Sequence, residues 1–354
     1  MYWLSLDVFL RAKLSLTSTP KGPARSLASY LPLPNMRQVA RYVRSTCGFR
    51  KVTLDTFASS TLIPHPRCHA TVHTPSPLSY DLRCLEAPRL SHAKDPDHVR
   101  QISQHLEKVG MLKIKLGFPD SNSDYLKQLL HSLHEHHNHQ LPISHSATRG
   151  WFWDVRPSET NFQAGDHQAR SETMNDFPWH TDCSYEEPPP RYFALQVLQH
   201  DRYGGGTLSV LNVQRLSELL PPSARAALKA PEYRISIPSE FIKDPSRKHI
   251  HATVLATSPD GESTMIRYRE DILEPLTDRA SRALEELKEA LVRKEVQAQA
   301  TVHLRSSDLP KGSIILMDNR RWLHARNHIN DPARHLRRVR WDVCPFGDAS
   351  ESRA

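Results

Sequence analysis

Short strand-like runs recur through the second half of the chain and restrict the folds that it can adopt. A single clear helix interrupts them, in which Ala280, Leu284, Leu287 and Leu291 follow helical spacing. The strand-like runs cover residues 192–200, 207–213, 234–242, 252–257, 264–268, 313–318 and 337–343. Many strands with helices before and between them favour a closed or double-sheet β core.

Helices are expected before this core. Asp95 and Pro96 are suited to the N-cap and first position of a helix, and Gly110 follows its apolar stripe. A strand over residues 112–116 and a second helix around residues 126–133 come next. These patterns predict a mainly β fold with flanking helices. We expect one domain over residues 78–347 and a short tail over 348–354.

The first 77 residues differ in composition from the rest. Residues 1–60 contain nine Lys and Arg against two Asp, within a basic extension rich in Ser and Pro. This composition is typical of a mitochondrial transit peptide, although a disordered tail or an incorrectly assigned start would look the same. The extension accounts for most of the net charge of +8. The remaining body is therefore nearly neutral, which argues against a nucleic-acid partner.

The apolar runs and the cysteines bear on where the protein resides. No apolar run approaches the roughly 20 residues of a membrane-spanning helix, so no membrane partner is expected. The five cysteines show no C-x-x-C spacing. Their pattern favours a reducing compartment over a disulfide scaffold or a cysteine-based zinc site. We expect an intracellular protein, in mitochondria or in the cytoplasm.

A His-x-Asp triplet stands at the centre of a Pro-rich stretch, where His180 and Asp182 flank Thr181. In an extended segment, side chains two residues apart point to the same side. An imidazole and a carboxylate would then converge as two ligands of a facial metal triad. A hydrogen-bonded His–Asp pair in a solvated loop is the alternative, since so short a motif also arises by chance.

A third ligand would normally be another neutral imidazole. The best-structured candidate is His324, which we expect at the rim after the apolar strand 313–318. Ten residues later comes Arg334, at the start of the last strand-like segment. Alternation places Arg334, Arg338 and Arg340 nominally on one face of that segment.

These pieces, in this order and spacing, resemble the taurine dioxygenase type (TauD/TfdA) of Fe(II)- and 2-oxoglutarate-dependent dioxygenases. The resemblance covers roughly residues 90–345. The matching segments are Trp179-His180-Thr181-Asp182, Pro188-Pro189, Gly205-Gly206-Thr207-Leu208, Asp318-Asn319-Arg320-Arg321-Trp322-Leu323-His324 and Arg334-His335-Leu336. The resemblance implies a double-stranded β-helix, the jelly roll of clavaminate synthase-like proteins.

The resemblance also implies roles for individual residues. His180, Asp182 and His324 would bind Fe(II) and form the catalytic centre. Arg334 and Thr207 match the residues that hold the cosubstrate 2-oxoglutarate, and a planar guanidinium can bind a carboxylate through two hydrogen bonds. Arg338 matches a position where related enzymes hold an anionic group of the substrate. The alternatives are a surface arginine for Arg334, a plain strand residue for Thr207, and an ion-paired rim arginine for Arg338.

The reaction expected from this resemblance is hydroxylation or desaturation of a small anionic or amino-acid-like substrate, with release of succinate and CO2. Halogenating relatives replace the carboxylate ligand by a small residue, whereas this chain keeps Asp182. The alternative is a catalytically silent β-helix protein that serves as a binding or regulatory module. Substrate specificity is expected in the rim loops around residues 143–176 and 240–250. The sequence leaves a homo-oligomer open.

Overall fold

The computed structural model describes residues 82–144, 150–160, 162–163 and 168–347. The basic extension predicted for residues 1–77 and the tail at residues 348–354 lie outside the described residues. The boundaries of the predicted domain therefore stay predictions.

The larger of two facing sheets has six strands, in the order β1-β2-β13-β5-β15-β3. Its neighbours are antiparallel except for β1 and β2, which run parallel. The strands are β1 (Cys84–Ala87), β2 (Met111–Leu116), β3 (Trp153–Val155), β5 (Pro190–Gln199), β13 (Ser313–Asp318) and β15 (His335–Val343). The two longest strands, β5 and β15, pair with each other, so the sheet is continuous through its centre.

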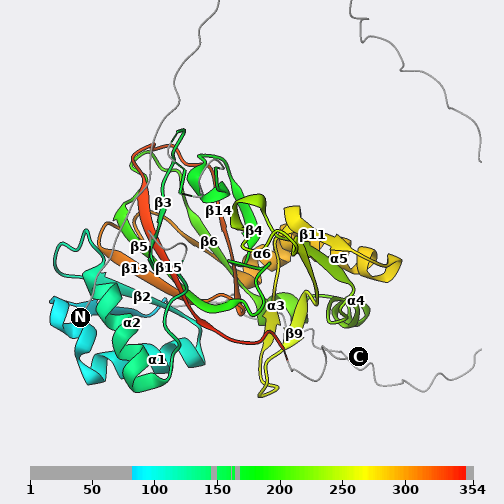
Figure 1. Cartoon of the computed structure of the whole chain (residues 1–354), viewed down its shortest axis with the longest axis horizontal. Helices are drawn as coiled ribbons and strands as arrows, with labels where there is room; N and C mark the ends of the chain where they lie inside the picture. Colours follow the sequence, from blue (N-terminus) through cyan, green and yellow to red (C-terminus); the bar gives the residue numbers. More distant parts are fainter. Residues whose placement is uncertain (1–81, 145–149, 161, 164–167, 348–354) are drawn as a thin grey trace, which may run out of the picture. The chain divides into compact units, whose positions relative to one another are not determined.

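The second sheet has four antiparallel strands in the order β12-β6-β14-β4. They are β4 (Phe177–His180), β6 (Leu208–Asn212), β12 (Thr301–Leu304) and β14 (Trp322–Arg326). Apolar side chains from both sheets form one buried core, to which Phe193 and Ile315 contribute from the larger sheet and Val210 and Trp322 from the smaller. The two sheets therefore pack face to face (Figure 1).

Strand β13 shows why the larger sheet needs a cover on its outer side as well. All six of its residues are buried. Ile315 and Met317 face the core between the sheets, whereas Ile314 and Leu316 belong to a separate core with the first two helices. Since side chains alternate between faces, an uninterrupted apolar run predicts a strand that is covered on both faces.

Helices α1 (Pro96–Lys108) and α2 (Asp124–His137) supply that cover (Figure 1). The predicted N-cap of α1 is confirmed, because the Asp95 side chain accepts a hydrogen bond from the backbone N–H of His98 at 2.9 Å. Gly110 lies just past the end of the helix with a φ of 78°, a conformation that favours glycine.

The remaining helices pack on the outer side of the smaller sheet. Leu211 and Leu323 from that sheet are buried against a second apolar core that these helices share with neighbouring short strands. The helices are α3 (Val213–Glu218), α4 (Pro222–Leu228), α5 (Asp278–Val292) and α6 (Lys294–Ala300). The short strands form two further sheets, β11-β7-β8 (Leu273–Pro275, Tyr233–Ser236, His249–Ala252) and β10-β9 (Thr264–Ile266, Leu255–Thr257).

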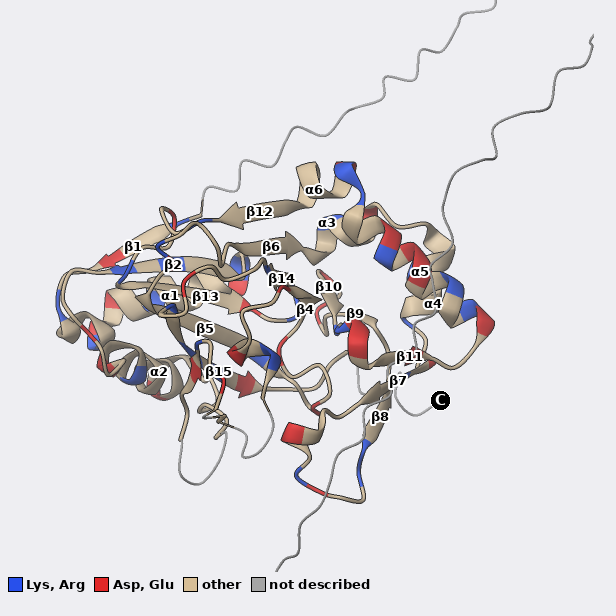
Figure 2. Cartoon of the chain, turned by 90° about the horizontal axis from the view of Figure 1, so that it is seen from above, with Lys and Arg blue, Asp and Glu red and all other residues tan. Residues whose placement is uncertain are grey.

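The predicted fold class, mainly β with helices around the sheets, is confirmed. Two predicted strand runs differ from the structure. The run 234–242 forms a strand only as far as Ser236, since Pro238 cannot donate to the ladder. The run 252–257 is divided between the end of β8 at Ala252 and β9. No described helix is long and apolar enough to cross a membrane. Basic and acidic residues are interspersed over the described elements (Figure 2).

Candidate metal centre

Two of the three predicted ligands face each other across paired strands. β4 pairs with β14 so that His180 lies directly opposite His324. The sequence placed His324 at a rim beyond a strand, and this position was wrong. His324 lies within strand β14. Antiparallel pairing brings opposed side chains within about 5 Å of each other. The two imidazole rings lie 4.1 Å apart between centroids.

Asp182 reaches the same point by a turn. Strand β4 ends at His180, so the extended alternation expected through Asp182 stops there, and Cys183 adopts a φ of 54°. Asn319 from the loop after β13 holds the turn in place. Its side-chain oxygen accepts from the Asp182 N–H at 2.7 Å, and its amide donates to the Asp182 carbonyl at 2.8 Å.

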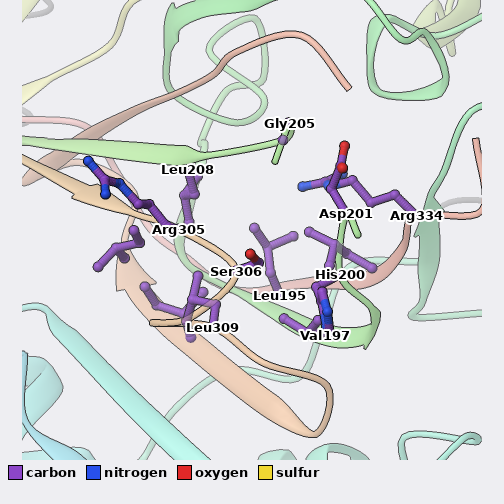
Figure 3. A pocket seen from close by; sticks show the side chains of 14 residues that line it. Leu195, Val197, His200, Asp201, Gly205, Leu208, Arg305, Ser306, Leu309 and Arg334 are labelled. Atoms are coloured by element: carbon purple, nitrogen blue, oxygen red, sulfur yellow. The ribbon is translucent and has the colours of Figure 1, made fainter. Parts of the chain in front are cut away.

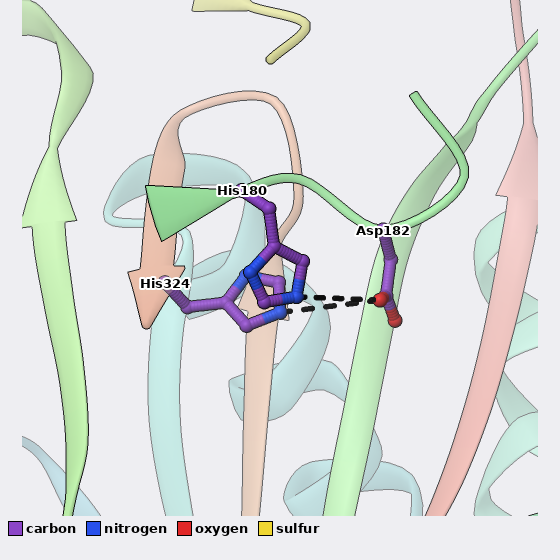
Figure 4. A group of neighbouring side chains, drawn as sticks. All are labelled: His180, Asp182 and His324. Carbon is purple, nitrogen blue, oxygen red and sulfur yellow. Dashed lines mark ion pairs between the residues drawn. The ribbon is translucent and has the colours of Figure 1, made fainter. Parts of the chain in front are cut away.

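The three side chains form a compact group between the two sheets (Figure 4). The Nε2 atoms of both His180 and His324 lie 4.0 Å from Asp182 Oδ1. One ligand atom from each residue lies within 4.8 Å of the other two, and all three residues are buried. Among the described residues, this is the only such group of His, Cys, Asp or Glu.

The orientation of His180 leaves its Nε2 directed toward the group. Its Nδ1 donates to the carbonyl oxygen of Pro178 at 2.8 Å, which assigns the second nitrogen as the free acceptor. The Phe177 ring stacks on the imidazole at 3.7 Å between centroids and 8° between planes. On the opposite strand, His324 packs against Phe193 of the larger sheet at 4.6 Å.

Burial controls the protonation of the group. It lowers the pKa of His180 well below the usual 6.5, and it lowers the pKa of His324 to about 4. Burial opposes ionisation of Asp182, but the Arg338 and Arg340 cations outweigh it and hold the pKa of this carboxyl below its usual range. At neutral pH the site therefore contains two neutral imidazoles and one carboxylate, the forms that bind metal.

The residues present fit a divalent transition metal. Asp182 Oδ2 is buried and has no hydrogen-bond partner in the described structure. Ligands at about 2.1 Å from one ion lie about 3 Å from each other, so the 4.0 Å separations close with small side-chain rotations. Two imidazoles and one carboxylate on one side of an ion are the donor set of non-haem Fe(II) oxygenases.

Arg334 is buried in the same interior, with 4% of its surface exposed. Burial lowers the pKa of its guanidinium to about 9, and neighbouring Arg326 adds to this. Its Nη1 has no hydrogen-bond partner in the described structure. It lines a pocket with apolar walls between the sheets, where Figure 3 shows it close to Asp201 and Gly205. The charge of Asp201 partly offsets the cation, but Arg334 forms no ion pair with a described carboxylate. A buried guanidinium of this kind indicates an anionic ligand.

Gly206 lies beside this guanidinium, whereas Thr207 is not among the residues that line its pocket. A Cβ added to Gly206 would stand 2.7 Å from Arg334 Nε, so glycine permits the arginine to pass close to the backbone. Thr207 follows immediately, and its N–H donates to the side-chain oxygen of Asn327 at 2.6 Å. The cosubstrate role expected for Thr207 therefore stays a prediction.

Arg338 lies at the metal group itself. Its Nη1 donates to Asp182 Oδ1 at 2.9 Å, while its buried Nε has no described partner. Arg340 lies two residues on and bonds the thiol of Cys183. The predicted alternation therefore holds for Arg338 and Arg340, which both face the core between the sheets.

Two supporting residues were not assigned a role from the sequence. Asn319 follows β13 in the run that carries the resemblance, but nothing in that run indicates that its amide holds Asp182. Phe177 stacks on His180 across three positions of one strand, and strand alternation alone does not predict this stack. Both contacts depend on a turn and a strand edge whose geometry the sequence does not specify.

The matches to known proteins agree with this geometry. A family model described as taurine catabolism dioxygenase TauD, TfdA family matches residues 85–340. The chain belongs to this family. The predicted family is thereby confirmed, and Fe(II)- and 2-oxoglutarate-dependent dioxygenase is the enzyme class that the prediction assigned.

Individual relatives match this chain at low sequence identity. L-asparagine oxygenase from Streptomyces coelicolor is 29% identical over 148 residues, which is 42% of this chain and only 41% of that protein. The structure of an asparagine oxygenase with Fe(II), 3-hydroxyasparagine and succinate has a TM-score of 0.55 at 21% identity, covering 71% of this chain and 82% of the other. The non-haem iron oxygenase OrfP with Fe and α-ketoglutaric acid has 0.51 at 16%, covering 75% and 86%. These two structures show a shared fold.

Proposed function

We propose that this protein is an Fe(II)- and 2-oxoglutarate-dependent dioxygenase that hydroxylates a small amino-acid-like substrate. In this reaction O2 supplies one oxygen atom to the substrate C–H bond and one to 2-oxoglutarate, which leaves as succinate and CO2. The observation that carries the proposal is a buried His–Asp–His group between the two sheets, together with the buried Arg334, which lines a separate pocket whose apolar walls belong to the same core.

His180, Asp182 and His324 would hold the iron. Bound Fe(II) would activate O2, the oxidant, for attack on an unactivated C–H bond, with 2-oxoglutarate supplying two of the four electrons. Arg334 would bind the distal carboxylate of 2-oxoglutarate through two parallel hydrogen bonds, with Thr207 as a hydroxyl donor. The protein's own part is to hold these groups in a dry interior between the sheets.

Arg338 would bind an anionic group of the substrate. Its Nη1 bonds Asp182, its buried Nε has no described partner, and the residue lines the pocket that also contains His180. Relatives whose structures share the fold are described with 3-hydroxyasparagine and with (3S)-hydroxy-L-Arg, both of which carry a carboxylate. These products support an amino-acid-like substrate here.

The fold proposed in finer detail is a double-stranded β-helix. Two facing antiparallel sheets that share one core support it, since this fold places metal ligands on strands around the interior. The carboxylate at position 182 favours hydroxylation or desaturation over halogenation. A catalytically silent binding module is disfavoured because all three ligands are present and face one point.

The test is succinate formation by the purified full chain. With Fe(II), ascorbate, O2 and 2-oxoglutarate, we expect iron-dependent release of succinate and CO2, at a low rate without substrate. His180→Ala should abolish it while the protein stays folded, because one of three ligands is lost. Absence of both succinate formation and a 2-oxoglutarate-dependent thermal shift in the wild-type protein would sink the proposal.

A further inference from the structure

The segment 239–247 follows strand β7 and lies against the pocket that contains the metal group. Several side-chain contacts hold it there. The 3-10 helix Ser239–Phe241 carries Phe241, whose ring stacks on Tyr185 at 5.5 Å and 12°. Beyond it, Lys243 bonds Glu186 at 2.8 Å. Arg247 bonds Glu187 at 2.6 Å. Residues 239–247 are therefore packed and ion-paired against the loop that follows Asp182.

Glu240 lies on this segment and lines the pocket that also contains His180, Asp182 and Arg338. The side chain is half-buried, and the hydrogen bond found for it comes from the adjacent Ser239 hydroxyl at 3.4 Å. It forms no ion pair with any described cation. The neighbouring acids Glu186, Glu187 and Asp271 each pair with a described Lys or Arg.

The cations of the pocket are already engaged elsewhere. Arg338 bonds Asp182, Arg340 bonds the Cys183 thiol, and Arg170 and Arg269 both pair with Asp271. Glu240 is thus a carboxylate beside the metal group that none of these arginines neutralises. A partly buried carboxylate favours a cation, and a charge-assisted hydrogen bond to it is about twice as strong as a neutral one.

We propose that Glu240 binds the ammonium group of the substrate, so that the enzyme selects a free amino acid whose carboxylate faces Arg338. The assignment rests on the proposed function. It deepens that function by adding the residue that separates amino acids from carboxylic acids without an amino group. Specificity arises because an amine-free acid leaves the Glu240 carboxylate partly desolvated and unpaired.

The experiment uses the twenty proteinogenic L-amino acids and, as matched probes, the same acids without the α-amino group. Succinate formation is measured over a range of concentrations of each acid. The proteins compared are the wild type, Glu240→Gln, Glu240→Asp and the exposed control Glu262→Gln. In the wild type, at least one amino acid should stimulate succinate formation at least about ten-fold more than its amine-free counterpart. Glu240→Gln should raise the KM for that amino acid by about 10- to 100-fold, the range for one lost charged hydrogen bond.

The variants show whether the preference for amino acids depends on the charge of Glu240. Glu240→Asp keeps the charge and should retain more of the preference than Glu240→Gln, while Glu262→Gln should retain all of it. The inference is overturned if amine-free acids stimulate as well as amino acids, if no amino acid stimulates, or if Glu240→Gln keeps the wild-type KM. No iron-dependent succinate from the wild type would instead refute the proposed function itself.

Discussion

At the scale of single residues, the position of Asp182 depends on an amide 137 residues further along the chain. The Asn319 side chain forms three hydrogen bonds with backbone groups, two to Asp182 and one to the carbonyl of Pro190 at 3.1 Å. None of these hydrogen bonds goes to a ligand atom. It fixes the turn that carries the carboxylate, which is the role that outer partners of metal ligands usually have.

Asn319→Ala should therefore weaken iron binding. It leaves three buried backbone groups without partners, and the expected loss of stability is about 2–4 kcal/mol. Affinity for Fe(II) should fall about 10- to 100-fold because Asp182 is no longer held in place. Anaerobic Fe(II) titration with urea unfolding measures both. The exposed Asn330→Ala should leave iron affinity unchanged and cost less stability, since its amide donates one hydrogen bond, to the Tyr203 carbonyl. Wild-type iron affinity in Asn319→Ala would contradict this role.

Gly206 allows a second prediction at this scale, with Gly204 as the matched control. Both have positive φ values, 65° and 82°, so alanine strains the backbone at either position. Only at Gly206 would the new Cβ meet a side chain, Arg334, whereas Gly204 faces open space. Gly206→Ala should raise the KM for 2-oxoglutarate by at least about ten-fold relative to Gly204→Ala. Equal KM values in the two variants would contradict the placement of the cosubstrate beside Arg334.

At the scale of elements, the edge strand β3 is joined to β15 by charged side chains as well as by its ladder. Asp154 accepts hydrogen bonds from His335 and from Arg337, each at 2.9 Å. His335 belongs to the Arg-His-Leu run that supported the family resemblance. The structure gives this histidine a task within the sheet, beside the residue that lines the cosubstrate pocket.

This contact predicts a pH-dependent contribution to stability. Burial opposes ionisation of Asp154, but the bonds from His335 and Arg337 lower its pKa from 3.8 to about 2. A carboxyl with a lowered folded-state pKa stabilises the protein above its unfolded pKa, and this is lost as pH falls through the folded value.

Asp154→Asn should accordingly lower the free energy of unfolding at pH 7 by roughly 1 kcal/mol, since solvent screens a half-buried group. The difference from wild type should shrink between about pH 4 and pH 2, where the wild-type carboxyl takes up its proton. Urea unfolding at pH 7 and pH 3 measures this change. A difference that is the same at both pH values would show that the charge of Asp154 does not contribute.

The elements also show what the sequence could reveal. The run 313–318 and the Asp95 cap predicted β13 and the start of α1, because an apolar strand and a capping residue are local signals. Strands β4 and β14 were not predicted, since their residues alternate poorly and their pairing joins segments far apart in the chain. The strand predicted over 234–242 is too long, because Pro238 ends the pairing after Ser236.

At the scale of the whole molecule, the sequence predicted the three candidate ligands but not how they meet. His324 was expected at a rim and lies in a strand; Asp182 was expected on an extended segment and lies in a turn. Strand pairing and the Asn319 hydrogen bonds decide both positions, and both are long-range effects. Glu240 lies in the segment 240–250, where the sequence predicted substrate specificity, but nothing in the sequence distinguished it from its neighbours. Its role depends on pocket arginines that come from distant parts of the chain and do not pair with it.

The central claim is that one interior holds a metal and, at Arg334, the far end of a chelating dicarboxylate. Calorimetric titration of 2-oxoglutarate into the full chain, without oxygen and with or without Fe(II), tests it most directly. If one molecule spans both groups, Fe(II) should tighten 2-oxoglutarate binding at least about ten-fold, and Arg334→Lys should weaken it in the iron-loaded protein. Equal affinity with and without iron would contradict the account.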